Sequence, residues 1–343
     1  MKLPDSRRRI CACLAVALTL SFGRSPGRAA ENPSAGRVVR PYAIIHAVTN
    51  LRRSVAFYRD GLGLQVETAS PLPLGSGPAV GQLVGAPGAG AKGVTLDIPG
   101  TEFRLILLRF SGVRQKTFHP QVPDFGAVKF IVTVRDMDEA WARIRPHVLR
   151  VFTTGGRPVE PLATNHHKAV IVADPDGYLL ELQTSEPFAK KSAAPLGSNT
   201  IDGRPSWSVE DLTTSLDFCR LGLGFRVVGK RPAAPPSALL LEGTPHALEA
   251  SGSIRPPGGG TIWFLTDFRN VRRQGLNSGV QDIGGGAVAL LTTGLPSLLD
   301  ALKRQGATVQ TSGGAPVNMG HGQEAVFIRS PAGVPMELIE QGH

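Results

Sequence analysis

An internal repeat constrains this chain of 343 residues more than any other feature of its sequence. The segment LRRSVAFYRDGLGL at residues 51–64 is matched by LTTSLDFCRLGLGF at residues 212–225, an offset of 161 residues. The segment VIVADPDGYLLEL at residues 170–182 is matched by VFIRSPAGVPMEL at residues 326–338, an offset of 156 residues. Two similar offsets in separate segments indicate a duplicated domain. We therefore expect two copies of one fold.

The stretch between the two copies has the composition of a linker, because it is rich in Ser, Ala, Pro, Gly and Lys. We predict a first domain at residues 41–185, a linker at residues 186–202 and a second domain at residues 203–341. Residues 31–40 are predicted to be a leader linker ahead of the first domain.

Each copy is itself doubled, as a strand, a short helix and then several strands. Asn50, Asp136 and Asp211 stand where a polar side chain can cap the first turn of each of three helices. One short helix among several strands predicts an α+β fold rather than a doubly wound parallel sheet.

The first thirty residues predict an export signal. Lys2 to Arg9 is positively charged, Ile10 to Phe22 is mostly apolar, and small residues follow up to Ala30. The run from Ser6 to Ile10 also resembles a twin-arginine signal, and an ordinary secretory signal is the alternative. We predict a signal peptide at residues 1–30 and a periplasmic or secreted mature protein.

Composition argues against two classes of partner. The net charge is +10, but the signal holds six of the 37 Lys and Arg residues, and the rest are spread along the chain with only 6% aromatic residues. A nucleic-acid surface needs clustered cations beside stacking rings, so we expect no nucleic-acid partner. No apolar run reaches about 18 residues, so we expect no membrane span in the mature chain.

Two segments of the first copy resemble a known family. The strand at residues 42–48 with the helix segment at residues 51–64, together with DPDGYLLEL at residues 174–182, is similar to the start and end of a vicinal oxygen chelate module. This superfamily includes glyoxalase I, extradiol dioxygenases, fosfomycin-resistance enzymes and bleomycin-binding proteins. The likeness covers most of residues 40–185 and, more weakly, residues 203–341.

The resemblance implies four βαβββ modules that form two glyoxalase-like, cup-shaped domains. In metal-using members the cup holds a divalent cation on ligands from the first and last strands of the modules. The cation then acts as a Lewis acid that stabilises negative charge on oxygen atoms of the substrate.

Two residues are candidate metal ligands under this resemblance. Glu181 stands at the closing-strand ligand position, and a carboxylate suits a divalent ion. The first-strand position, seven residues before Asn50, falls on Ala43. His46 lies nearby on the opposite face of the strand, so a bulge would have to turn it inward. The candidate ions are Zn, Fe, Ni and Mn, and the site could also hold no ion. The alternative for His46 is a histidine that is hydrogen-bonded within the strand and binds no metal.

Lys129 occupies the corresponding position before Asp136. Its ammonium only donates hydrogen bonds, so it cannot ligate a metal in that form. Strand alternation allows Lys129 to pair with Glu181 across the floor of the cup. The alternative is that Lys129 binds an anionic group of a substrate. Leu107 falls where the carboxylate of the first module is expected.

The remaining candidate donors are few. His119, His166 and His167 could add donors from loops, although no spacing requires it. In the second copy the expected ligand positions hold Arg204, Leu265, Ala289 and Glu337, of which only the glutamate matches. We therefore expect residues 203–341 to be a degenerate domain without a metal site.

The incomplete ligand set leaves two functions open. The first is an exported protein that binds a small organic molecule in the cup without a metal, as bleomycin-resistance relatives do. The second is a metal-dependent enzyme, of lyase, isomerase or dioxygenase type, acting on a small molecule with adjacent oxygens. In either case residues 71–93, rich in Gly and Pro, are predicted to form a loop over the cup. The sequence indicates no oligomeric state.

Overall fold

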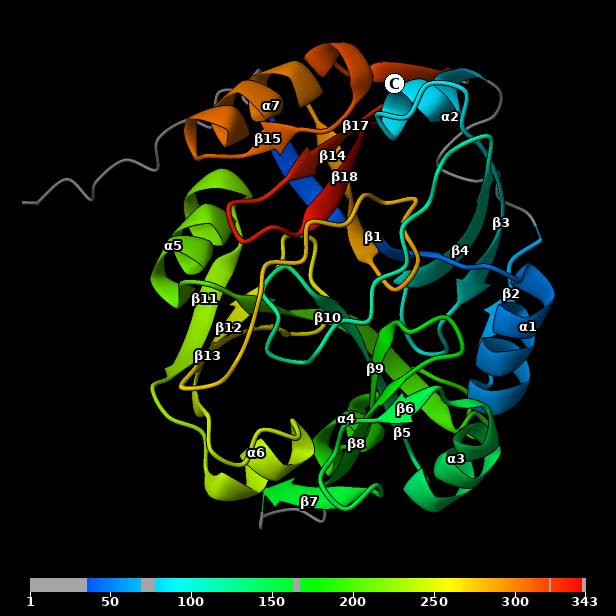
Figure 1. Ribbon diagram of the computed structural model, residues 1–343, viewed down its shortest axis with the longest axis vertical. Coiled ribbons are helices and arrows are strands. Elements are labelled where there is room, and N and C mark those ends of the chain that lie inside the picture. Colours follow the sequence, from blue (N-terminus) through cyan, green and yellow to red (C-terminus); the bar gives the residue numbers. More distant parts are fainter. Residues whose placement is uncertain (1–35, 69–77, 163–166, 321, 341–343) are drawn as a thin grey trace, which may run out of the picture. The chain divides into compact units, whose positions relative to one another are not determined.

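The computed structural model describes residues 36–68, 78–162, 167–320 and 322–340. Within these ranges the chain forms two mixed sheets of nine strands each, with short helices between the strands (Figure 1). The predicted α+β class is confirmed. The predicted signal peptide at residues 1–30 lies outside the described residues. No helix of the described ranges is both long and apolar enough to cross a membrane.

The first sheet combines strands from the beginning and the end of the chain. Its central strands, β1 and β14, are antiparallel, with Ala43 opposite Ala289 (Figure 1). In order across the sheet the strands are β15 (Thr308–Val309), β17 (Gln323–Arg329), β18 (Pro335–Glu340), β14 (Gly286–Thr293), β1 (Arg37–Ala47), β4 (Arg104–Ser111), β3 (Gly90–Asp97) and β2 (Gln65–Val66), and β16 (Val317–Gly320) pairs with β17.

The second sheet is built from the middle of the chain. Its central strands, β5 and β10, are antiparallel, with Ile131 opposite Arg204. In order across the sheet the strands are β11 (Arg226–Arg231), β12 (Leu248–Arg255), β13 (Trp263–Arg269), β10 (Thr200–Val209), β5 (Val128–Val134), β9 (Leu179–Thr184), β8 (His167–Ala173) and β6 (Arg150–Val151), and β7 (Val159–Leu162) pairs with β8.

Each sheet therefore joins strands from both predicted domains. The predicted linker at residues 186–202 contains α4 (Glu186–Lys191) and connects β9 to β10, two strands of the same sheet. The domain boundaries at residues 41–185 and 203–341 stay a prediction about the repeat in the sequence, because the composition of a sheet does not say which segments fold independently.

The three predicted helix caps are confirmed. The side chains of Asn50, Asp136 and Asp211 each accept a hydrogen bond from the backbone N–H three residues further on. They begin α1 (Leu51–Ala56), α3 (Met137–Ile144) and α5 (Leu212–Asp217). The other helical segments are η1 (Phe57–Gly61), α2 (Pro78–Leu83), η2 (Arg145–His147), η3 (Phe218–Gly222), α6 (Pro236–Leu241), α7 (Leu295–Arg304) and η4 (Ser312–Gly314).

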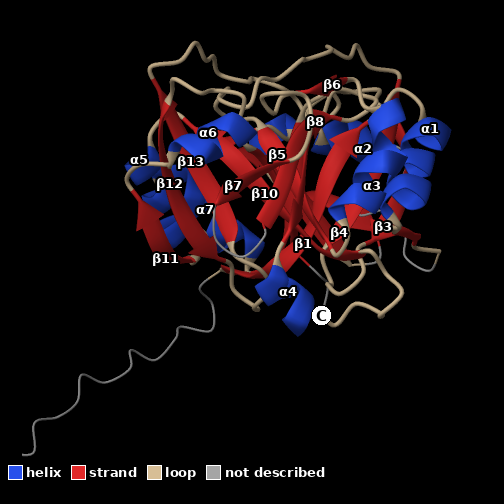
Figure 2. Cartoon of the chain, turned by 90° about the horizontal axis from the view of Figure 1, so that it is seen from below, coloured by secondary structure: helices blue, strands red, loops and turns tan. Residues whose placement is uncertain are grey.

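Strand alternation gives each sheet two faces with different partners. On the helix side, residues of both sheets such as Ile44 and Leu180 share one apolar core with residues of α3, α5 and α7. We call the opposite face of each sheet its inner face. Figure 2 shows that the loops gather beyond one end of the strands.

A short helix covers each inner face. Val80 and Leu83 of α2 pack on the inner face of the first sheet, and Leu239 and Leu241 of α6 pack on that of the second. In the described part of residues 71–93, α2 is a helix where a loop was predicted, because its apolar spacing is hidden in a Gly- and Pro-rich stretch.

The turn from Asp174 to Gly177 joins β8 to β9 in the second sheet, and its side chains also contact the start of α1. Gly177 has a φ of 89°, which confirms the predicted strand-joining turn. The Asp176 carboxylate accepts hydrogen bonds from the N–H and hydroxyl of Thr49 and from Ser54 at the start of α1. This turn of the second sheet is therefore attached to the first helix of the chain.

Candidate functional site

The inner face of the second sheet carries the predicted pair. Lys129 lies on β5 and Glu181 on the neighbouring strand β9, where Glu181 is opposite Ile131, two residues after Lys129. Lys129 Nζ lies 2.6 Å from Glu181 Oε2, and the two side chains are only 10% and 8% exposed. The ion pair, which the sequence left open as one alternative for these two residues, is therefore present.

A third charged residue, Glu242, was missed by the sequence analysis. Its carboxylate lies 3.4 Å from Lys129 Nζ, and its side chain is 12% exposed. Glu242 follows α6 directly, and the end of that helix is fixed because Thr154 N–H donates to the Leu240 carbonyl and the Thr153 hydroxyl donates to the Leu241 carbonyl. An acidic residue after an apolar run gives no signal in the sequence that it would reach Lys129.

Burial and neighbouring charges shift the pKa values of Lys129 and Glu242. Burial alone would lower the pKa of the Lys129 ammonium, but the carboxylates of Glu181 and Glu242 outweigh burial and raise it. Burial raises the pKa of the Glu242 carboxyl to about 7, because Lys129 offsets burial only in part and Glu181 and Glu249 add repulsion. Lys129 is therefore a permanent cation, whereas Glu242 can exchange a proton near neutral pH.

Glu242 separates two spaces above the inner face. A cavity of about 10 Å³, room for about one water molecule, lies against Lys129, Ser206 and Thr266. A pocket of about 460 Å³, which we call the outer pocket, is lined by His119, Gln121, Val122, Pro123, Asp124, Arg150, Phe152, Glu242, Gly243, Thr244, Val271, Arg272, Arg273 and Gln274. Val122 and Glu242 line both spaces, so a molecule in the outer pocket lies next to Glu242.

Further buried ion pairs extend across the same inner face. Arg204 pairs with Asp202, and its guanidinium lies over the rings of Phe188 and Phe264. Glu249 accepts from Arg231. Arg204 and Glu249 thus each have an oppositely charged partner of their own beside the apolar residues of this face.

The inner face of the first sheet contrasts with this arrangement. Glu337 on β18 lies opposite Ala289 and Phe327, as Glu181 lies opposite Ile131 and Ile171. Glu337 is fully buried, and neither of its carboxylate oxygens has a hydrogen-bond partner among the described residues. Burial raises its pKa to about 8. The carboxyl is therefore held in its neutral form at neutral pH.

Matching contacts identify what Glu337 lacks. The Thr311 hydroxyl donates to the carbonyl of Leu83 at the end of α2, as Thr153 donates to Leu241 at the end of α6. The next residue after each leucine is Val84 in the first case and Glu242 in the second. The strand position equivalent to Lys129 is Ala287, two residues before Ala289.

The structure does not bring His46 to Glu181. Its Nε2 lies 3.0 Å from an Asp174 oxygen, and its ring stacks on Tyr178 at 4.5 Å between centroids, on the helix side of the first sheet. Burial alone would raise the pKa of Asp174, but His46, the Tyr178 N–H and the Tyr58 hydroxyl together lower it. The pairing of His46 and Glu181 as one ligand set is therefore wrong, because β1 keeps its alternation at this point.

Two other sequence assignments were one residue out of phase. Leu107 and Leu265 pack in the helix-side core, so neither occupies the inner ligand position. Ile106 and Leu108 face inward on β4, and Thr266 lines the small cavity on β13. All of these are non-acidic, so the correction adds no metal ligand.

The loop histidines add no donor to Glu181. His119 lines the outer pocket, and His167 Nε2 lies 3.2 Å from the Gln183 amide oxygen. His166 lies outside the described residues.

The residues present do not fit a divalent metal. A catalytic metal usually has about three protein donors. Glu181 and Glu242 both contact the Lys129 ammonium, which has no lone pair to give a metal. Among the described residues, Glu337 has no hydrogen-bond partner. Within the described ranges, no group of three or more His, Cys, Asp and Glu side chains is placed to hold a metal ion.

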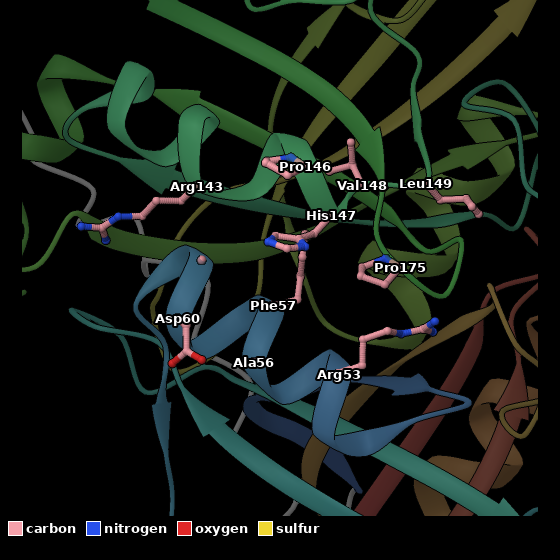
Figure 3. Close-up of a pocket in the computed structure, with 11 residues that line it drawn as sticks. Arg53, Ala56, Phe57, Asp60, Arg143, Pro146, His147, Val148, Leu149 and Pro175 are labelled. Carbon is pink, nitrogen blue, oxygen red and sulfur yellow. The ribbon is translucent and has the colours of Figure 1, made fainter.

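A larger cavity, of about 700 Å³, lies away from both inner faces, between α1 with η1 and the segment around η2 (Figure 3). Phe57 and Val148 contribute apolar surface, His147 contributes a polar ring, and the arginines Arg53 and Arg143 contribute charge. Both arginines already have carboxylate partners, in Asp176 and Glu139. None of the predicted site residues lines this cavity.

Comparison with known proteins finds a family match for the first part of the chain and a shared fold for most of it. Residues 43–182 match the family model described as the Glyoxalase/Bleomycin resistance protein/Dioxygenase superfamily. Glyoxalase I from Zea mays is 16% identical, with 89% of this chain and 92% of that chain covered and a TM-score of 0.54. A putative dioxygenase from Bacillus subtilis is 16% identical, with 89% of this chain and 86% of that chain covered and a TM-score of 0.52. A comparison with curated proteins finds no significant match.

Residues 43–182, less than half of the chain, are similar to this superfamily, and the two sheets match the fold of two glyoxalase-like domains. Members of this superfamily bind small-molecule substrates and usually a divalent metal. The two solved structures show the fold alone at this level of identity.

Proposed function

We propose that this protein binds a small organic molecule over the inner face of the second sheet, and that the Lys129 ammonium replaces the metal cation of metal-using relatives. The observation that carries this proposal is the contact of 2.6 Å between Lys129 Nζ and Glu181 Oε2. Glu181 stands at the closing-strand position where the family resemblance expects a metal ligand. Its charge is instead neutralised by a cation of the chain itself.

The outer pocket supports a small-molecule ligand. Its volume of about 460 Å³ lies in the range of about 300–1,000 Å³ that is usual for such sites. Val122, Phe152 and Val271 offer apolar surface, and His119 and Arg150 offer polar contacts. Apolar walls with a few polar groups are usual for small-molecule sites.

The alternative is a metal-dependent lyase, isomerase or dioxygenase. Glu181 on the inner face favours it, because this residue stands at the position where the family resemblance expects a metal ligand. The donor set argues against it, since Lys129 is the closest partner of Glu181. The binding function is therefore the better supported of the two.

Ligand binding is tested with a diverse library of small molecules, measured by thermal shift and confirmed by calorimetry. Gln274→Trp fills the outer pocket from an exposed position. The control, Asn277→Trp, makes the same change at a separate pocket of about 290 Å³ that is lined by Val84 and Phe327. We expect hits that the Gln274 variant loses and the Asn277 variant keeps. Hits that survive Gln274→Trp, or no hit at all, would contradict the proposal.

We also propose that residues 1–30 export the chain to the periplasm or the exterior. The charged start, the apolar stretch and the small residues before Ala30 support this. Cell fractionation with mass spectrometry of the N-terminus tests it. Replacement of Arg8 and Arg9 by Lys blocks export if the twin-arginine route is used. A full-length chain in the cytoplasm contradicts the proposal.

A further inference from the structure

Glu242 has an unusual position between the outer pocket and the buried cation. Lys129 Nζ lies 2.6 Å from Glu181 but 3.4 and 3.5 Å from the two oxygens of Glu242. The contact with Glu181 is therefore tight and the contact with Glu242 is loose. Of the two carboxylates, Glu242 is the one that lines the outer pocket.

We propose that the ligand is a small organic anion and that Glu242 is the internal substitute for its anionic group. On binding, the carboxylate of the ligand displaces that of Glu242 from Lys129 and becomes the second anionic partner of the ammonium. This inference rests on the proposed function and names the class of ligand.

The charges around the outer pocket favour an anion. Arg150 lies over the Phe152 ring at 4.6 Å and donates to the amide oxygen of Gln121. Arg272 is exposed at the same pocket. Among the described residues, no carboxylate is recorded at ion-pairing distance from either arginine. Unpaired arginines beside a pocket attract anions and bind carboxylates in a planar geometry.

Two other acidic residues at or beside the outer pocket are engaged by other groups. Both oxygens of Asp124 accept backbone N–H groups, from Gln121 and Gln274. Arg273 is paired with Asp267 and keeps that carboxylate occupied. Glu242 is then the acidic group of the pocket that remains to compete with an incoming anion for a cation.

The charge balance explains why Glu242 must give way. With both glutamates ionised, Lys129, Glu181 and Glu242 carry one net negative charge, and a second buried charge from the ligand would add repulsion. The groups that face Glu242 are Lys129, Glu181 and Glu249, and His119 shares its pocket. Since the pKa of Glu242 is raised to about 7, mainly by burial, the carboxyl can take up a proton as the anion arrives.

The test uses three probes with the same ring, namely benzoate, benzamide and benzylamine, with calorimetry at about pH 8. Glu242→Gln removes the competing charge and leaves the Lys129–Glu181 contact intact. We expect the variant to bind benzoate about fivefold or more tightly than the wild type does. In both proteins, benzamide and benzylamine should bind more weakly than benzoate. Glu324→Gln, an exposed change on the first sheet, is the charge-matched control and is expected to behave as the wild type.

The wild type alone provides a second readout. Calorimetry in two buffers of different ionisation enthalpy should show proton uptake with benzoate near neutral pH, and the uptake should vanish in Glu242→Gln but persist in His119→Gln. Tighter binding of benzylamine than of benzoate overturns the inference, and so does unchanged or weaker benzoate binding in Glu242→Gln. These results concern only the anionic class of the ligand. The proposed function itself is contradicted if no library compound binds in the outer pocket.

Discussion

The two inner faces place the same residue in opposite surroundings. Glu181 and Glu337 stand at equivalent strand positions, each opposite an apolar residue on both neighbouring strands. Glu181 is paired with Lys129 at 2.6 Å, whereas Glu337 has no partner among the described residues. The fold therefore fixes where the carboxyl points, and the two or three residues around it decide whether it is charged.

The largest expected effect comes from removing the cation of the second sheet. Lys129→Met leaves Glu181 buried without its closest partner, which should lower the free energy of unfolding by about 3–5 kcal/mol. Urea denaturation measures this change. Lys230→Met, an exposed change on β11 of the same sheet, is expected to stay within about 0.5 kcal/mol of the wild type. Equal effects at the two positions would show that the Lys129–Glu181 contact is not stabilising.

The same substitution should have opposite signs on the two sheets. Glu181→Gln loses a charge-assisted hydrogen bond to Lys129 and should destabilise by about 1–3 kcal/mol. At about pH 8 the buried Glu337 carboxyl lowers the stability of the folded state, because burial disfavours its ionised form. Glu337→Gln removes this group and should raise the free energy of unfolding by about 1–3 kcal/mol. Paired urea titrations compare the two variants. A loss of stability in both would contradict the difference between the faces.

The pH dependence of stability sharpens this comparison for Glu337. Its pKa is raised to about 8 in the folded protein, against about 4.3 in an unfolded chain. Between these values the folded state holds the extra proton, so this group lowers the free energy of unfolding by up to about 1.4 kcal/mol for each unit that the pH rises. Stability curves of the wild type and Glu337→Gln should diverge from about pH 5 to about pH 8 and run parallel above it. Parallel curves throughout would mean that Glu337 has a partner in solution.

Local sequence signals predicted much of this fold. The caps at Asn50 and Asp136 and the turn ending at Gly177 depend on residues close together in the chain, and each is confirmed. The pairing of Lys129 with Glu181 was one of the alternatives that strand alternation allowed, and the structure shows it.

Contacts between distant residues were not predictable in the same way. The pairing of β1 with β14 joins residues about 245 apart, and no local pattern specifies such a partner. Glu242 comes from a helix that the sequence did not reveal, so its approach to Lys129 could not be seen. Leu107 and Leu265 were placed on the wrong face because an error of one residue in register reverses a strand.

The central claim is that an ammonium replaces the metal beside Glu181, and metal content tests it most directly. The mature protein is incubated in turn with Zn²⁺, Fe²⁺, Ni²⁺ and Mn²⁺, desalted and analysed by mass spectrometry of the elements, alongside Glu181→Gln. The account predicts metal far below one equivalent per chain, with no change in the variant. About one equivalent in the wild type, lost in Glu181→Gln, would contradict it.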